Sequence, residues 1–329
     1  MTENIYKTDI KTGLSSKEVN ERISKNLVNT NNMKAGNTFA SDSGSIKITS
    51  YSAKEGVNIA EGSTLKNFGK GDIEVTSHGE KGILANGDIK NPNGNVRLTT
   101  TNGTIYANGK IVNANGNTEL TSTNGILLAS SGSINNSNGN TTLKNKGTIG
   151  IDVKGTIENS GGNLTLDNTA TDGILVDNNV LNSNGDVIIN NTGAKGIVVN
   201  SQIKNNVGNL SMTNSGEAGI VINGDVINYD GNSTYLNEAG EFTVNGNIKN
   251  SNGLLKVTNN GTGIKIASTG SVINEKSGDL EMTNTGENGI VINGFSSNEN
   301  GDSTYLNEAG EFTVNKSINN KDGNVKITN

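Results

Sequence analysis

The sequence predicts an all-β solenoid, a parallel β-helix in which the chain winds through about 13 rungs. Three observations support this prediction. A unit of 22–25 residues recurs from Gly71 to Asn329, aliphatic and polar residues alternate within each unit, and an asparagine occupies one fixed place in nine successive units. A fixed period between 20 and 50 residues is typical of repeat architectures. The rungs start at Gly44, Gly71, Gly94, Gly116, Gly139, Gly162, Gly185, Gly208, Gly231, Gly253, Gly278, Gly301 and Gly323.

Each unit contains three short aliphatic clusters separated by turn residues. In one representative unit the first cluster is Leu164 with Leu166, and the second is Ile174 with Val176. A spacing of two is the strand period, and the intervening Asn, Gly, Asp and Ser favour turns. Three short strands per rung are therefore expected. The third cluster is assigned to Ile89, Ile111, Ile134, Ile157, Leu181, Ile203, Ile227, Ile248, Ile273 and Ile318.

An asparagine column indicates how successive rungs are joined. It consists of Asn145, Asn168, Asn191, Asn214, Asn237, Asn259, Asn284, Asn307 and Asn329. Stacking would bring these amides to about 4.8 Å, where each can donate to one neighbour and accept from the other. We interpret the column as a buried ladder; the alternative is a set of exposed turn asparagines. Four earlier rungs hold a hydroxyl at this place: Ser50, Ser77, Thr100 and Ser122.

A longer duplication is superimposed on the rungs. Ser233–Asn245 and Ser303–Asn315 are identical in sequence and lie 70 residues apart, which is three rungs. Duplication of whole rungs suits a fibre whose length can change, and it suits a finely placed active site poorly.

Composition excludes several classes of protein. The net charge of −6 and the absence of a basic cluster argue against a nucleic-acid partner. The chain has no cysteine, so disulfides and cysteine-based zinc sites are excluded. No stretch approaches the roughly 20 apolar residues of a membrane helix, and the N-terminus lacks the apolar run of a signal peptide.

Residues 1–32 differ from the repeats that follow. Ser15 and Glu18 form a candidate capping box, and Val19, Ile23 and Leu27 fall on one helical face. We expect a helical or poorly ordered segment over 1–32 and the repeat array over 33–329; an origin of 1–32 unrelated to the array is an alternative. The array stops after one strand of a rung, so a truncated C-terminus and a longer parent chain are expected.

Residues with catalytic or metal-binding potential are few. His78 is the only histidine and falls in a turn sequence. The acids Asp167, Asp172, Asp177 and Asp186 lie within 20 residues, but neighbouring rungs do not repeat acids at matching places. Solvated turn residues are the expected interpretation for all five. We therefore predict no catalytic residue, no metal site, no cofactor and no enzymatic activity.

Two tyrosines occupy a place that other rungs fill with Leu, Ile, Val or Met. Tyr235 and Tyr305 are equivalent residues of the 70-residue duplication. We expect both to lie in or near the core. The alternative is a pair of surface aromatics that contacts a sugar.

The units GNLTLDNTATDGILVDNNVLNSNG and GNTTLKNKGTIGIDVKGTIENSGG resemble repeats of filamentous-haemagglutinin-like exoproteins of Gram-negative bacteria. The resemblance covers roughly Gly44–Asn329. It implies a right-handed β-helix, export by two-partner secretion or as an autotransporter passenger, and display outside the cell. It also implies an outer-membrane translocator for the full-length protein. An N-terminal secretion domain and a C-terminal anchor, which the family would have, are not found in the sequence.

The stretch 13–29 separately resembles the cytosolic N-terminal segment of cation-transporting P-type ATPases, except that Asn26 stands where that family usually has Gly. No DKTGT phosphorylation motif follows, so transport is not implied.

Three functions remain in competition. The first is a structural stalk segment of a surface-displayed adhesin that attaches to a receptor or glycan on host or bacterial cells. The second is a segment of a secreted cytolysin or leukotoxin, which would use the same stalk. The third is a polysaccharide-degrading β-helix enzyme, which would need a groove built from long loops; the near-constant spacing leaves little room for one.

Overall fold

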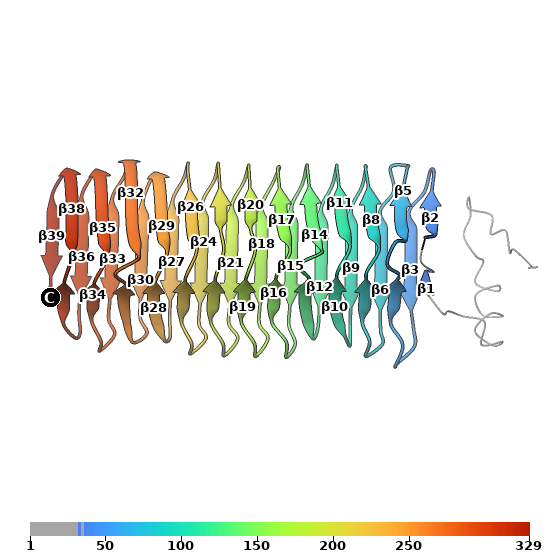
Figure 1. The fold of residues 1–329 in the computed structure, drawn as a ribbon, viewed down its shortest axis with the longest axis horizontal. Coiled ribbons are helices and arrows are strands. Elements are labelled where there is room, and N and C mark those ends of the chain that lie inside the picture. Colours follow the sequence, from blue (N-terminus) through green and yellow to red (C-terminus); the bar gives the residue numbers. More distant parts are fainter. Residues whose placement is uncertain (1–31, 34–35) are drawn as a thin grey trace, which may run out of the picture.

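A computed structural model describes residues 32–33 and 36–329, and it confirms the solenoid. The described residues form three parallel sheets of 13 strands each, and none of them is helical (Figure 1). Each rung contributes one strand to every sheet, so the rungs stack side by side along a straight rod. The helix expected from Ser15 to Leu27 lies outside the described residues.

Sheet A collects the second aliphatic cluster of each rung. Its strands are β1 (Asn32–Met33), β4 (Val57–Ile59), β7 (Ile83–Ala85), β10 (Thr104–Ala107), β13 (Gly125–Leu128), β16 (Ile151–Val153), β19 (Ile174–Val176), β22 (Ile197–Val199), β25 (Ile220–Ile222), β28 (Glu241–Val244), β31 (Gly263–Ile266), β34 (Ile290–Ile292) and β37 (Phe312–Val314).

Sheet B collects the third cluster. Its strands are β2 (Thr38–Ser41), β5 (Thr64–Asn67), β8 (Asp88–Asn91), β11 (Lys110–Asn113), β14 (Ser133–Asn136), β17 (Thr156–Asn159), β20 (Val180–Asn182), β23 (Ile203–Asn205), β26 (Asp225–Asn228), β29 (Asn247–Asn252), β32 (Ser271–Ser277), β35 (Phe295–Asn300) and β38 (Ser317–Asp322).

Sheet C collects the first cluster and ends in the predicted asparagine column. Its strands are β3 (Ile46–Ser50), β6 (Ile73–Ser77), β9 (Val96–Thr100), β12 (Thr118–Ser122), β15 (Thr141–Asn145), β18 (Leu164–Asn168), β21 (Val187–Asn191), β24 (Leu210–Asn214), β27 (Ser233–Asn237), β30 (Leu255–Asn259), β33 (Leu280–Asn284), β36 (Ser303–Asn307) and β39 (Val325–Thr328).

Inward and outward residues alternate along every strand of the middle rungs. In β18, Leu164, Leu166 and Asn168 are buried while the two residues between them are partly exposed. Equivalent residues pair across rungs, as Leu164 does with Val187 in the next rung. The aliphatic residues therefore form continuous columns that run through one core. At the C-terminal end, Val325 and Ile327 keep the inward register but are 46% and 48% exposed, because no rung covers them.

Three third-cluster assignments are wrong. Leu181, Ile227 and Ile273 face outward, and the inward place belongs to the preceding residue, which is Val180, Val226 and Val272 respectively. The reason is a buried asparagine two residues further along each strand, at Asn182, Asn228 and Asn274. Because strand side chains alternate with period two, the asparagine fixes which of two adjacent aliphatic residues turns inward.

The predicted asparagine ladder is confirmed. From Asn145 to Asn307 the side chains are at most 2% exposed. Each Nδ2 donates to Oδ1 of the asparagine in the next rung at 2.6–2.9 Å, in eight successive bonds that end at Asn329. The exposed-turn alternative is therefore wrong. The four earlier rungs fill the column with the predicted hydroxyls, and Thr100 Oγ1 donates to Ser122 Oγ at 3.0 Å.

A second buried ladder, which sequence reasoning missed, lies at or near the C-terminal ends of the sheet B strands. It contains Asn67, Asn91, Asn113, Asn136, Asn159, Asn182, Asn205, Asn228, Asn250, Asn274 and Asn298, all at most 1% exposed. From Asn136 to Asn298 each Nδ2 donates to the next Oδ1 at 2.8–3.2 Å. Two corners of the rung are thus joined through buried amides. The Oδ1 atoms of Asn91, Asn113 and Asn136 accept no hydrogen bond from any described residue, so the continuous ladder begins at Asn136. Buried amides that are hydrogen-bonded from rung to rung specify one register.

Candidate functional site

The widest part of the rod lies on sheet B near the C-terminal end. Strands β29, β32, β35 and β38 have six or seven residues, whereas the other strands of this sheet have three or four. The rung from Gly253 to Gly278 has 25 residues, and its extra length falls in β32. Lys276 takes a positive φ of 65°, and the register between β29 and β32 shifts after Asn250. A bulge of this kind bends the strand and changes the outer surface.

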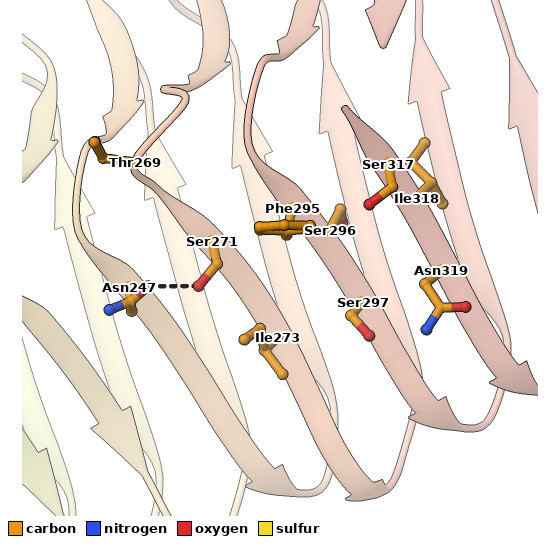
Figure 2. A pocket seen from close by; sticks show the side chains of 10 residues that line it. All are labelled: Asn247, Thr269, Ser271, Ile273, Phe295, Ser296, Ser297, Ser317, Ile318 and Asn319. Carbon is orange, nitrogen blue, oxygen red and sulfur yellow. Dashed lines mark hydrogen bonds between the residues drawn. The ribbon is translucent and has the colours of Figure 1, made fainter. Parts of the chain in front are cut away.

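The outer face of these four strands carries a shallow groove of about 650 Å³ (Figure 2). One row of outward residues runs across it through Asn247, Ser271, Phe295 and Ser317, which pair in consecutive strands. Within this row Ser271 Oγ donates to Asn247 Oδ1 at 2.6 Å. The lining residues are Asn247, Thr269, Ser271, Ile273, Phe295, Ser296, Ser297, Ser317, Ile318 and Asn319.

Phe295 is the one aromatic side chain of the groove. It is 46% exposed, and Lys316 Nζ lies 3.9 Å from the centre of its ring. The same Nζ donates to the carbonyl oxygen of Ser268 at 3.4 Å. A cation over an aromatic face is attracted by the ring quadrupole. The ring is therefore held in place as a fixed apolar surface among hydroxyls and amides.

The groove offers groups that can bind a ligand. Its ten lining residues provide hydroxyl groups, amides, one phenyl ring and two isoleucines. These groups can form hydrogen bonds and apolar contacts with a molecule in the groove.

The structure places His78 in a surface turn, as predicted. Its Nδ1 lies 2.9 Å from Thr101 Oγ1, and its ring stacks on Tyr51 with centroids 5.3 Å apart. Neither contact is with an acid. Among the described residues, no group of three or more His, Cys, Asp or Glu side chains could hold a metal ion.

The four acids singled out by the sequence do not meet. Asp167 pairs with Lys144 at 3.3 Å, and Asp172 pairs with Lys195 at 2.8 Å. Asp177 accepts a hydrogen bond from an asparagine side chain of the next rung, and Asp186 accepts one from a backbone N–H of the next rung. Each of the four acids therefore forms a contact between two neighbouring rungs.

Tyr235 and Tyr305 are both fully buried, so the core interpretation is correct and the surface-aromatic alternative is wrong. Tyr305 Oη lies 2.7 Å from Ser296 Oγ, whereas Tyr235 Oη has no hydrogen-bond partner in the part of the chain that the structure describes. Burial raises the pKa of the Tyr305 phenol to about 12, although the Ser296 hydrogen bond lowers it in part. Burial raises the pKa of Tyr235 further.

Sequence reasoning did not find the groove, although the duplication contains a signal for it. With the 70-residue offset, Phe295 corresponds to Asp225 and Ser296 corresponds to Val226. They are two of the six differences between 225–232 and 295–302, a stretch that immediately precedes the identical segments 233–245 and 303–315. One copy of this stretch carries an outward aromatic residue and an inward hydroxyl.

No described residue belongs to a helix that is long and apolar enough to cross a membrane. Comparisons of the chain with protein-family models, curated proteins and solved structures return no match.

Proposed function

We propose that this chain is a rigid spacer segment of an exported bacterial surface protein, an adhesin that attaches to host or bacterial cells, and that it acts without catalysis. The observation that carries the proposal is the stack of 13 rungs in three parallel sheets, joined at two corners by buried amide ladders from Asn136 and Asn145 onward. Turns between strands stay short, so every rung adds the same increment of length.

The length that each rung adds to the rod supports a spacer role. At about 4.8 Å per rung, 13 rungs extend for roughly 60 Å. Each rung contacts only its neighbours, so length can change by whole rungs without disturbing the rest. The 70-residue duplication is a change of this kind. Attachment to a receptor or glycan would then depend on how far the rod holds a binding surface from the cell.

The duplication also supplies the experiment. Deleting 213–282 joins Met212 to Thr283 and recreates the Met-Thr-Asn sequence present in both copies. The deletion removes three rungs, about 14 Å, and keeps the register of all three sheets. In the full-length gene product, we expect the deletion to reduce attachment of the bacterium to host cells. Reinserting 213–282 recreates the original length and should restore attachment.

Small-angle scattering of the purified chains would verify the change in length. Attachment that is unaffected by three rungs would contradict the spacer role. Lysis of leukocytes with no adherence defect on deletion of the gene would favour a cytolysin. Cleavage of pectin, glycosaminoglycan or a chitin-type polymer by the pure chain would contradict a non-catalytic role.

A further inference from the structure

The outer face of sheet A carries a column of apolar side chains that nothing in the described chain covers. In most strands of this sheet, one central outward residue stands between two buried ones. In β28 the outward residue, Thr243, is itself only 9% exposed. These outward residues pair from strand to strand in unbroken register. In order they are Asn58, Leu84, Tyr106, Leu127, Asp152, Leu175, Val198, Val221, Thr243, Lys265, Val291 and Thr313, and we call them the outer column.

Seven of the twelve members of the outer column are Leu, Val or Tyr. Tyr106 is 37% exposed, and the aliphatic members are partly exposed. Contiguous exposed apolar surface marks an interaction site.

Two charges interrupt the apolar column. Asp152 is the fifth member and Lys265 is the tenth. Asp152 Oδ2 is bound by Lys154 Nζ at 2.7 Å, and its Oδ1 is buried and accepts no hydrogen bond from any residue that the structure describes. Lys265 is exposed. A partner that offers an anion opposite Lys265, a second cation beside the Asp152–Lys154 pair and apolar residues between them complements this face.

We propose that the partner is a second copy of this chain, packed face to face through the outer column with the two rods antiparallel. A two-fold axis along the strand direction, between the rungs of Val198 and Val221, places each of these residues opposite the other in the partner copy. The fifth member then faces the tenth, so Asp152 of each copy meets Lys265 of the other. The remaining facing pairs are Leu175 with Thr243, Leu127 with Val291 and Tyr106 with Thr313.

The two charges select this arrangement over the alternatives. If the rods were parallel and related by a two-fold axis along their length, Asp152 would face Asp152 and Lys265 would face Lys265. Like charges opposite each other are unfavourable. Among antiparallel registers, only the one centred between Val198 and Val221 brings Asp152 and Lys265 together. When the order of the outer column is reversed about Val198 and Val221, the acidic member therefore falls opposite the basic member.

The area fits a dimer that dissociates on dilution. The overlap from Tyr106 to Thr313 spans ten rungs, or roughly 48 Å. The strands of sheet A in this overlap have three or four residues, so the contact is on the order of 10–13 Å wide. It covers roughly 500–600 Å² on each chain and roughly 1,000–1,200 Å² in total, at the lower end of the range of specific interfaces.

The first test is the mass of the chain in solution. Light scattering across a dilution series should show a species of twice 34.1 kDa that dissociates on dilution. Asp152→Lys alone and Lys265→Asp alone each place like charges across both contacts, and each should weaken the dimer at least tenfold. The double variant restores an opposite pair at both contacts and should recover the dimer. Lys204→Asp, on sheet B, is the matched control and should leave the mass unchanged.

The second test fixes orientation, and it uses the absence of cysteine in the chain. Leu127→Cys and Val291→Cys are made in separate preparations, mixed and treated with a bismaleimide that spans about 10 Å, the distance between packed sheets. Antiparallel packing predicts a cross-link between the two variants and little cross-linking in either alone. These residues face outward, so the rungs should fold normally, and circular dichroism before cross-linking would verify this.

Several outcomes would overturn the proposal. These are a monomer at every concentration, a dimer unaffected by the single charge reversals, or cross-linking of Leu127→Cys with itself, which indicates parallel rods. A monomer in which Tyr106 is protected from surface labelling would mean that another segment of the same chain covers the column. The spacer role does not depend on these results, because length and attachment are measured separately.

Discussion

Replacing Asn214 with leucine tests the buried ladder of sheet C most directly. Asn214 Nδ2 donates to Asn237 Oδ1 at 2.9 Å and to the Gly216 carbonyl oxygen at 2.8 Å. Its Oδ1 accepts from Asn191 Nδ2 at 2.8 Å and from the Gly216 N–H at 3.2 Å. Leucine has similar size and can make none of these four hydrogen bonds.

The expected loss follows from these contacts. A buried hydrogen bond contributes about 1 kcal/mol, and a buried group left without a partner costs about 1–3 kcal/mol. Four lost bonds amount to about 4 kcal/mol. The added apolar surface of leucine offsets about 1 kcal/mol of this. We therefore expect Asn214→Leu to lower the free energy of opening of its rung by about 3 kcal/mol.

Asn223→Leu is the matched control, since it makes the same chemical change in an exposed column. Asn223 also donates to one rung, at Asn200 Oδ1, and accepts from the next, at Asn245 Nδ2, both at 2.7 Å. Water can replace these partners, so we expect a loss below about 1 kcal/mol.

The assay must report on single rungs, because a repeat array does not unfold in one all-or-none step. Hydrogen exchange measured on peptides from 191–259 gives the free energy of local opening for each rung. Protection in Asn214→Leu that matches the Asn223→Leu control would refute the argument that buried amides hold the rungs together.

Three further predictions use contacts in other parts of the rod. Tyr305→Phe should lower stability by about 1 kcal/mol because it removes the hydrogen bond to Ser296, whereas Tyr235→Phe should be neutral or stabilising; denaturation of the two variants compares them. Gly208 has a φ of 113°, and Gly208→Ala would place the new Cβ 2.3 Å from a carbonyl oxygen of the preceding rung. This variant should reduce the local protection from hydrogen exchange by several kcal/mol. Gly44→Ala is the control, because its Cβ would lie 3.8 Å from the nearest atom and should leave the protection unchanged. Burial raises the pKa of Asp72, but hydrogen bonds from the Asn95 backbone and the Arg97 guanidinium in the next rung lower it below its ordinary 3.8 overall. The stability that the Asp72 carboxylate contributes is therefore complete above pH 3.8 and is lost as the pH falls through the lowered pKa. Asp72→Asn should remove this part of the acid dependence of hydrogen exchange in its rung.

The fold was predictable because its determinants are local and repeated. Leu164 and Leu166 identify an inward face by their spacing alone, and stacking then requires the same residues in the next rung. The second ladder was missed for a physical reason. Asparagine also fills exposed turns of this chain, as at Asn223, so the residue type does not distinguish a buried amide from an exposed one.

Features that depend on how neighbouring rungs pair could not be predicted from the sequence of a single repeat unit. The outward direction of Leu181 follows from the amide of Asn182, which is paired with Asn205 in the next rung. The groove at Phe295 requires the extra length of β32, whose bulge sits one rung away from the aromatic residue. Neither can be derived from one unit considered alone.

The two copies of the duplication indicate which changes the stack accepts. At the outward place, Asp225 in one copy corresponds to Phe295 in the other, with no loss of the strand pairing on either side. At the adjacent inward place, Val226 corresponds to Ser296, and there the buried hydroxyl is accepted because Tyr305 Oη lies 2.7 Å away. A buried polar group without a partner is costly, while an exposed side chain is not. Binding surfaces on this rod can therefore change on its outer faces, where the groove and the outer column lie, while the buried ladders keep the rungs in register.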